Sequence, residues 1–246
     1  MLVVAVSMPT QGAPPKPPAR WTTTLVTGLA DTFQLTLGGA FGNGPAWQSR
    51  IESGLTNAWS QGDSVYVCLS ESLGLDPRRS DWQANVEYRR PVWEQGRQQL
   101  AALFGFQHWK FANVKTGTND WLTHEALIYR AALPRRLGVI ATSDSWTLLK
   151  SPLPKGSLLH TQVWVEHVLH KSERVSVTFR HGPAHTYSWE FYGTNGHRVI
   201  RYQTLVAITF RGGTRVEGGI RRQLGLQPSI PDNNFWQFSI AKVWSR

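Results

Sequence analysis

Residues 174–192 read RVSVTFRHGPAHTYSWEFY, and they show the clearest periodicity of the chain. Val175, Val177 and Phe179 alternate with polar neighbours, and residues 186–192 repeat the pattern with aromatic side chains. A period of two residues is typical of a β-strand with two unlike faces, whereas a helix has a period of 3.6. The stretch therefore predicts two successive strands, 174–180 and 186–192.

Similar runs of β-branched and aromatic residues predict further strands along the chain. They cover residues 22–26, 32–37, 65–69, 104–114, 126–131, 137–142, 162–169, 199–211 and 235–243. Pro134-Arg135-Arg136 predicts a turn, and Asn195-Gly196 predicts a type I′ hairpin turn.

Two segments predict helices instead. In residues 46–60, Trp47, Ile51, Leu55 and Trp59 recur every four residues, which is the spacing of one helical face. Residues 92–103 follow a proline suited to a first helical turn and precede Gly105. The polar stretch 71–90 between them is expected to be a long loop.

About ten strands without regular strand–helix alternation predict an all-β, mostly antiparallel fold. We expect a jelly-roll-like β sandwich with two short helices in loops. Residues 1–20 are rich in proline and predict an extended N-terminal arm, so residues 21–246 form a single β-sandwich domain.

Composition excludes several other classes. A single cysteine, Cys68, excludes an internal disulfide framework and a multi-cysteine zinc site, and its apolar neighbours indicate that it fills a core. No run approaches about 18 apolar residues, and the N-terminus lacks the pattern of a signal peptide. Neither secretion nor membrane spanning is indicated.

The charge points to a polyanionic partner. The chain has 26 Lys and Arg against 16 Asp and Glu, a net charge of +10. Residues 1–123 hold 10 basic and 9 acidic residues, so the remaining 16 basic and 7 acidic residues place +9 in the second half. Such an excess favours binding to nucleic acid, RNA or DNA, although it fits anionic lipid or an acidic protein as well.

Arginine pairs in the predicted loops and strand ends are the candidate binding residues, because guanidinium groups bind phosphate bidentately. The predicted nucleic-acid-binding residues are Lys16, Arg20, Arg78, Arg79, Arg89, Arg90, Arg135, Arg136, Arg211, Arg215, Arg221 and Arg222. Solvated loop ends are the alternative for each pair.

No catalytic or cofactor motif accompanies this charge. The chain lacks a Gly-x-Ser-x-Gly elbow and a phosphate-binding glycine loop, so no enzyme and no cofactor are predicted. His181 and His185 flank a predicted turn at a spacing that could chelate a metal, but we favour surface histidines. The twelve tryptophans are expected to be core or interface anchors, with base stacking as the alternative.

Residues 104–114 (FGFQHWKFANV) and 198–210 (RVIRYQTLVAITF), with the proline-rich arm, resemble the single jelly-roll coat proteins of small icosahedral viruses. The resemblance implies self-assembly into a shell that encloses and neutralises nucleic acid. The arm departs from that family because it carries only Lys16 and Arg20 as basic residues.

This interpretation implies a homo-oligomer located in the virion. The main alternative is a non-structural nucleic-acid-binding protein of the cytoplasm or nucleus, such as a viral movement protein or a suppressor of RNA silencing. A sugar-binding or hydrolytic β sandwich is a third class.

Overall fold

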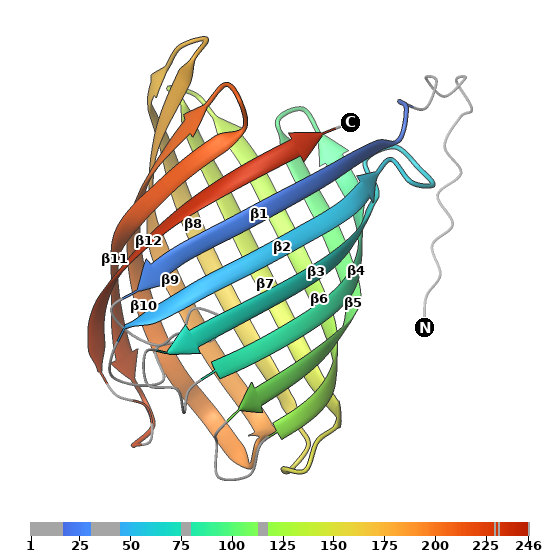
Figure 1. The fold of residues 1–246 in the computed structure, drawn as a ribbon, viewed down its shortest axis with the longest axis vertical. Coiled ribbons are helices and arrows are strands. Elements are labelled where there is room, and N and C mark those ends of the chain that lie inside the picture. The colour runs from blue at the N-terminus through green and yellow to red at the C-terminus, as the bar shows by residue number, and fades with distance from the viewer. Residues whose placement is uncertain are drawn as a thin grey trace.

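The computed structural model describes residues 17–30, 45–74, 80–112, 118–228, 230 and 232–245. Twelve strands lie in them, and the strands form one closed barrel (Figure 1). The strands are β1 (Arg20–Ala30), β2 (Ala46–Thr56), β3 (Ser64–Gly74), β4 (Ser80–Gln95), β5 (Gln98–Ala112), β6 (Thr118–Leu133), β7 (Leu137–Lys150), β8 (Ser157–Lys171), β9 (Val175–Phe191), β10 (Thr194–Phe210), β11 (Thr214–Gly225) and β12 (Asn233–Ser245).

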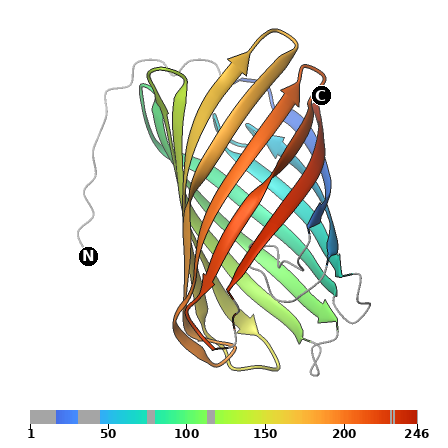
Figure 2. The same ribbon diagram turned by 90° about the vertical axis from the view of Figure 1, so that its left-hand side faces the viewer.

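Each strand pairs antiparallel with the strand next to it in sequence, and β1 closes the barrel against β12. The strands run obliquely to the barrel axis (Figure 2), as closure of a sheet requires. Closure leaves no sheet edge, so the backbone hydrogen bonds of every strand are satisfied within the sheet. Because the number of strands is even, β1 begins and β12 ends at the same rim, which we call the terminal rim; the other is the opposite rim.

The predicted jelly-roll sandwich is therefore wrong. A jelly roll joins two sheets by long connections between strands that are not neighbours, whereas here sequence order and spatial order agree. Strand existence was better predicted than architecture: residues 22–26, 65–69, 162–169 and 235–243 all lie within strands. The predicted strand 32–37 lies outside the described residues.

Both predicted helices are strands. Residues 46–56 form β2. Trp47, Ile51 and Leu55 are four residues apart, and four is a multiple of the strand period of two, so they share the outward face of a strand as readily as one face of a helix. Residues 92–103 are the end of β4 and the start of β5, joined at Gly96 with φ +57°. The predicted loop 71–90 contains the end of β3 and most of β4.

The two strands predicted from residues 174–192 are one continuous strand, β9. Gly182 permits this continuity, because a Cβ at that position would lie 1.8 Å from the carbonyl oxygen of Val163 on β8. The hairpin turn that follows is not at Asn195-Gly196. It is at Tyr192-Gly193, whose φ values of +54° and +74° fit a type I′ turn.

Two further predictions concern chain ends and turns. Pro134-Arg135-Arg136 does form a turn, in which both arginines have positive φ (+59° and +64°). The first sixteen residues lie outside the described ones, and the described part of the predicted arm already enters β1 at Arg20. The division into an arm and one domain stays a prediction.

Candidate functional site: the barrel lumen and the outer belt

The outer surface of the barrel is apolar. Leu25 on β1 is 42% exposed and Ile51, its cross-strand neighbour on β2, is 44% exposed. Every strand contributes such side chains, for example Leu25, Ile51, Val67, Val86, Phe104, Leu127, Leu149, Val163, Trp189, Ile200, Ile220 and Phe238. A contiguous exposed apolar surface of this extent is uncommon on a protein surrounded by water.

Nine of the twelve tryptophans are exposed, and each lies near the end of a strand or in the β2–β3 connection. They are Trp21, Trp47, Trp59, Trp82, Trp93, Trp121, Trp189, Trp236 and Trp244. The tryptophans thus mark both margins of the apolar belt, and they are not core anchors. Trp109, Trp146 and Trp164 belong to the lumen face instead.

The lumen face of the same strands holds the buried polar and charged side chains, beside apolar ones such as Leu205. On β10, Arg201 and Gln203 point inward and are 1% and 2% exposed, and Gln223 faces them from β11. The alternation is therefore polar-in and apolar-out, the inverse of a soluble sandwich.

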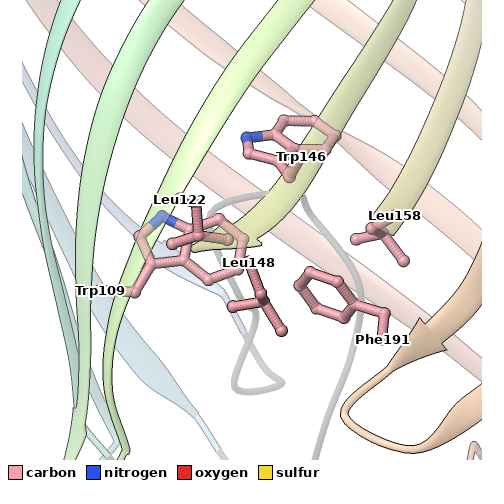
Figure 3. Packing of buried hydrophobic residues seen from close by; sticks show 6 residues of the cluster. All are labelled: Trp109, Leu122, Trp146, Leu148, Leu158 and Phe191. Atoms are coloured by element: carbon pink, nitrogen blue, oxygen red, sulfur yellow. The ribbon is translucent and has the colours of Figure 1, made fainter. Parts of the chain in front are cut away.

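An apolar cluster occupies the lumen on the β5–β9 side near the opposite rim. Figure 3 shows its six side chains, Trp109, Leu122, Trp146, Leu148, Leu158 and Phe191, all at most 4% exposed. Tyr192 packs against the cluster and donates a hydrogen bond of 2.6 Å to Asp120 Oδ2. Burial and the Asp120 carboxylate raise the pKa of the Tyr192 phenol, so its hydroxyl remains a donor at neutral pH.

A hydrogen-bonded network adjoins this cluster. Glu87, Gly105, His124 and Trp146 occupy one row across β4 to β7. Because Gly105 has no side chain, Glu87 reaches across it, and His124 Nδ1 lies 3.0 Å from Glu87 Oε1. The other ring nitrogen, Nε2, lies 3.2 Å from Asp144 Oδ1.

Indole groups complete this network. The Trp146 ring stacks on the His124 ring, with centroids 4.6 Å apart and planes 7° from parallel. Trp109 and Trp146 both donate their Nε1–H to Gln107 Oε1, at 2.9 and 3.2 Å. Gln107 Nε2 in turn donates to Glu87 Oε1 at 3.1 Å. The β4–β7 wall, which we call the acidic wall, thus joins the Glu87 and Asp144 carboxylates in one hydrogen-bonded network.

The β9–β11 wall is basic. Arg180, Arg201, Arg215 and Arg221 occupy lumen positions there. Glu217 accepts hydrogen bonds from Arg180 Nη2 at 2.5 Å and from Arg215 Nη2 at 2.6 Å. Four guanidinium groups and one carboxylate give these five side chains a net charge of +3. The acidic and basic walls are separated by β8 on one side and by β12, β1, β2 and β3 on the other.

The predicted binding arginines do not converge. Arg89 and Arg90 point to opposite faces of β4, and Arg221 and Arg222 to opposite faces of β11, because adjacent strand residues alternate. Arg20, Arg135, Arg136 and Arg211 lie at the terminal rim, and Arg215 faces the lumen. Lys16, Arg78 and Arg79 lie outside the described residues. Phosphate binding by these side chains stays a prediction.

Sequence reasoning missed Arg180, Arg201, Glu217 and His124. One signal in the sequence was available for Arg180. It shares a face of its strand with Ser176 and Thr178, whereas Val177 and Phe179 lie on the other face. Polar residues that repeat with period two over many strands share one face, and closure of the barrel turns that face inward.

The histidines considered for metal binding lie on the outer face of β9. His181 Nδ1 lies 2.7 Å from the hydroxyl of Tyr202, and His185 Nε2 lies 2.9 Å from Nδ1 of His197. In the described part of the chain, no three or more histidine, cysteine or acidic side chains gather as a metal site.

The sequence matches no protein-family model and no curated protein. Solved structures do match. The chain is similar to an outer membrane channel from Pseudomonas putida F1, with 11% identity over 96% of this chain and 100% of that one and a TM-score of 0.63. It is also similar to the NanC porin, with 8% identity over 91% and 99% of the two chains and a TM-score of 0.54.

A third similar structure is the translocator domain of the autotransporter NalP from Neisseria meningitidis, with 10% identity, coverage of 92% and 87%, and a TM-score of 0.54. At these identities the likeness shows the fold, a closed antiparallel barrel. The three proteins are described as a channel, a porin and a translocator domain.

These findings overturn the functional interpretation drawn from the sequence. The chain folds as a closed antiparallel barrel, like the solved structures named above, and not as the jelly roll of a viral coat protein. The predicted shell, the nucleic-acid partner, the self-association and the location in virion, cytoplasm or nucleus are therefore withdrawn.

The prediction that the chain does not span a membrane is also corrected. It rests on the absence of long apolar runs, which are typical of transmembrane helices and not of transmembrane strands. The described residues contain no helix long and apolar enough to cross a bilayer, but strands cross with short alternating segments.

Proposed function

We propose that the chain is a membrane-spanning β-barrel of the outer-membrane type, and that its lumen is a channel for small polar solutes. The observation that carries the proposal is the inverted pattern: an apolar outer belt with tryptophans at both margins, around a polar and charged lumen. In hydrocarbon, only a closed barrel or a helix satisfies all its backbone groups internally. Solved structures described as an outer membrane channel and a porin share the fold.

The height of the belt supports this proposal. Trp236 and Trp244 are eight residues apart on β12, and Trp82 and Trp93 are eleven apart on β4. With about 3.3 Å per residue and a tilt of about 40°, these separations span about 20 to 28 Å along the axis, close to the roughly 25 Å apolar band of such barrels. Tryptophan rings favour the two membrane–water interfaces.

Connection lengths favour one orientation. The β4–β5, β6–β7, β8–β9 and β10–β11 connections at the terminal rim have two or three residues each, whereas the longest connection, residues 31–45, joins β1 to β2 at the opposite rim. Barrels of the outer membrane have short periplasmic turns and longer extracellular loops. We therefore assign the terminal rim to the periplasmic side.

Reconstitution tests the proposal. The protein, refolded in detergent and mixed with phosphatidylcholine vesicles, is expected to float with the vesicles in a density gradient and to stay with them in alkaline carbonate. In planar bilayers it should give discrete conductance steps. A protein that is monodisperse without detergent and leaves vesicles in carbonate would contradict membrane insertion. Stable insertion without conductance steps would contradict the channel alone.

A further inference from the structure

The lumen leaves space along the wall opposite the apolar cluster. Large rings fill the β5–β9 side near the opposite rim, whereas β1, β3 and β12 each contribute small inward residues to the facing wall. These are Gly28, Ser70, Ser72 and Ser239. They line a cavity of about 190 Å³ that also reaches β2 and β11. A solute in this half of the lumen therefore meets the cavity and not the rings.

Hydrogen-bond donors line the cavity from both sides. Arg50 reaches it from β2 and Arg221 from β11, with Gln48 and Gln237 beside them. Ser70 also lines it; that side chain is 9% exposed, and its Oγ has no hydrogen-bond partner among the described residues. A buried hydroxyl without a partner costs about 1–3 kcal/mol of folding free energy. A ligand oxygen that accepts a hydrogen bond from Ser70 Oγ would offset this cost.

The charge near the cavity is positive on the β11 side and balanced on the β2 side. Arg221 belongs to the basic wall, where four guanidinium groups accompany the Glu217 carboxylate, and Arg50 forms an ion pair with Glu52. Glu71 is the one carboxylate among the lining residues that the structure describes, and it stands on the outward, exposed face of β3. Low-dielectric walls of one sign concentrate ions of the other sign.

We propose that this cavity binds a small oxyanion, the carboxylate or phosphate group of a solute in the lumen, between Arg50 and Arg221, with Ser70 as a hydroxyl donor. Guanidinium groups form paired hydrogen bonds with both kinds of anion. The inference rests on the proposed channel, because it names the class of solute that the lumen holds.

Anion titration of the folded barrel in detergent micelles tests the site. Sodium phosphate and sodium acetate are titrated separately by calorimetry, with sodium chloride keeping the ionic strength constant. Saturable binding of one ion per barrel is expected for at least one of the two, and the tighter of them identifies phosphate or carboxylate as the recognised group. Failure of both to bind saturably overturns the proposal.

Variants locate the binding. Arg221→Gln or Arg50→Gln should weaken binding at least about tenfold, and Ser70→Ala about three- to tenfold, from the usual worth of charged and neutral hydrogen bonds. Arg222→Gln is the matched control, because Arg222 is the neighbour of Arg221 on the outer face. Equal losses in Arg221→Gln and Arg222→Gln would contradict the site. Arg221→Lys keeps the positive charge but cannot form two parallel hydrogen bonds with an oxyanion, so it should also weaken binding. It serves as the test if a glutamine variant does not fold.

Conductance separates this proposal from the one on which it rests. Discrete conductance steps without phosphate or acetate binding would keep the channel and overturn the anion site. Saturable, Arg221-dependent binding in micelles without conductance in bilayers would keep the anion site and overturn the channel.

Discussion

The outward and inward faces of a strand in this barrel differ sharply in the polarity and exposure of their side chains. On β10, Ile200 and Val206 face outward and are 43% and 42% exposed, whereas Arg201 and Gln203 face the lumen and are 1% and 2% exposed. Since closure satisfies the backbone of both faces alike, the side chains alone distinguish the two surroundings. The outer face matches hydrocarbon, and the inner face builds a bonded polar interior.

The largest expected effect is on the inner face, at the centre of its network. His124→Ala removes the partner shared by the buried Glu87 and Asp144 carboxylates, so it should lower the free energy of unfolding by about 3–5 kcal/mol. Urea titration in micelles, followed by tryptophan fluorescence, measures it. His181→Ala on the outer face should cost about 1 kcal/mol or less, because it loses one hydrogen bond to Tyr202. Similar losses for both histidines would contradict the comparison.

A charge placed on each face of one strand gives the next largest difference. Leu25→Arg puts a cation in the middle of the outer belt of β1, where arginine costs about 2–4 kcal/mol in a bilayer. Thr24→Arg turns the same cation into the lumen and should change stability by less than about 1 kcal/mol. The experiment is urea unfolding in vesicles. If Thr24→Arg were the more damaging variant, the assignment of faces would be reversed.

Gly105 tests the crowding of the inner face. A Cβ at this position would lie 2.8 Å from Glu87 Cγ and 2.7 Å from the Val86 carbonyl oxygen, so Gly105→Ala should destabilise the barrel by about 1–3 kcal/mol. Gly138 also faces the lumen, but its nearest neighbours would be 3.7 Å away, and Gly138→Ala should stay within about 0.5 kcal/mol. Equal losses of unfolding free energy for Gly105→Ala and Gly138→Ala in urea would show that Glu87 does not need the space that Gly105 leaves open.

The smallest expected difference compares two tyrosines. Tyr192→Phe removes the hydrogen bond to the buried Asp120 carboxylate near the opposite rim and should cost about 1.5 kcal/mol, the low end for a charged acceptor. Tyr187→Phe on the outer face of β9 should cost less than about 0.5 kcal/mol. The difference is measured by the same unfolding assay. A larger loss at Tyr187 would argue that the outer hydroxyl is also bonded to the protein.

Strand content could be predicted from the sequence because period-two alternation is a local property. The run from Val175 to Phe179 is a strand in the structure, as the alternation indicated. The run from Trp47 to Leu55 was mistaken for a helix because a spacing of four satisfies both periods over so short a segment. Its Arg50-Ile51-Glu52 triplet, polar on both sides of an apolar residue, carried the strand signal.

The alternation alone could not predict which of the two sets of side chains, apolar or polar, faces the interior. Val177 and Thr178 alternate in the same way whether the apolar residue packs into a core or faces a bilayer, and we assumed a core. The candidate site failed for a related reason. Arg221 and Arg222 were grouped as neighbours, yet neighbours on a strand point to different surroundings, and the cavity that Arg221 lines depends on the closure of β1 against β12.

Spin labels along β10 report whether the outer face of the barrel contacts lipid. Cys68 is the single cysteine and is replaced by serine, after which one labelled cysteine is placed in turn at residues 199–208 of the barrel in vesicles. Even-numbered positions should collide with oxygen dissolved in the bilayer, and odd-numbered positions should not. Even-numbered positions that collide instead with a water-soluble nickel chelate would contradict the membrane barrel.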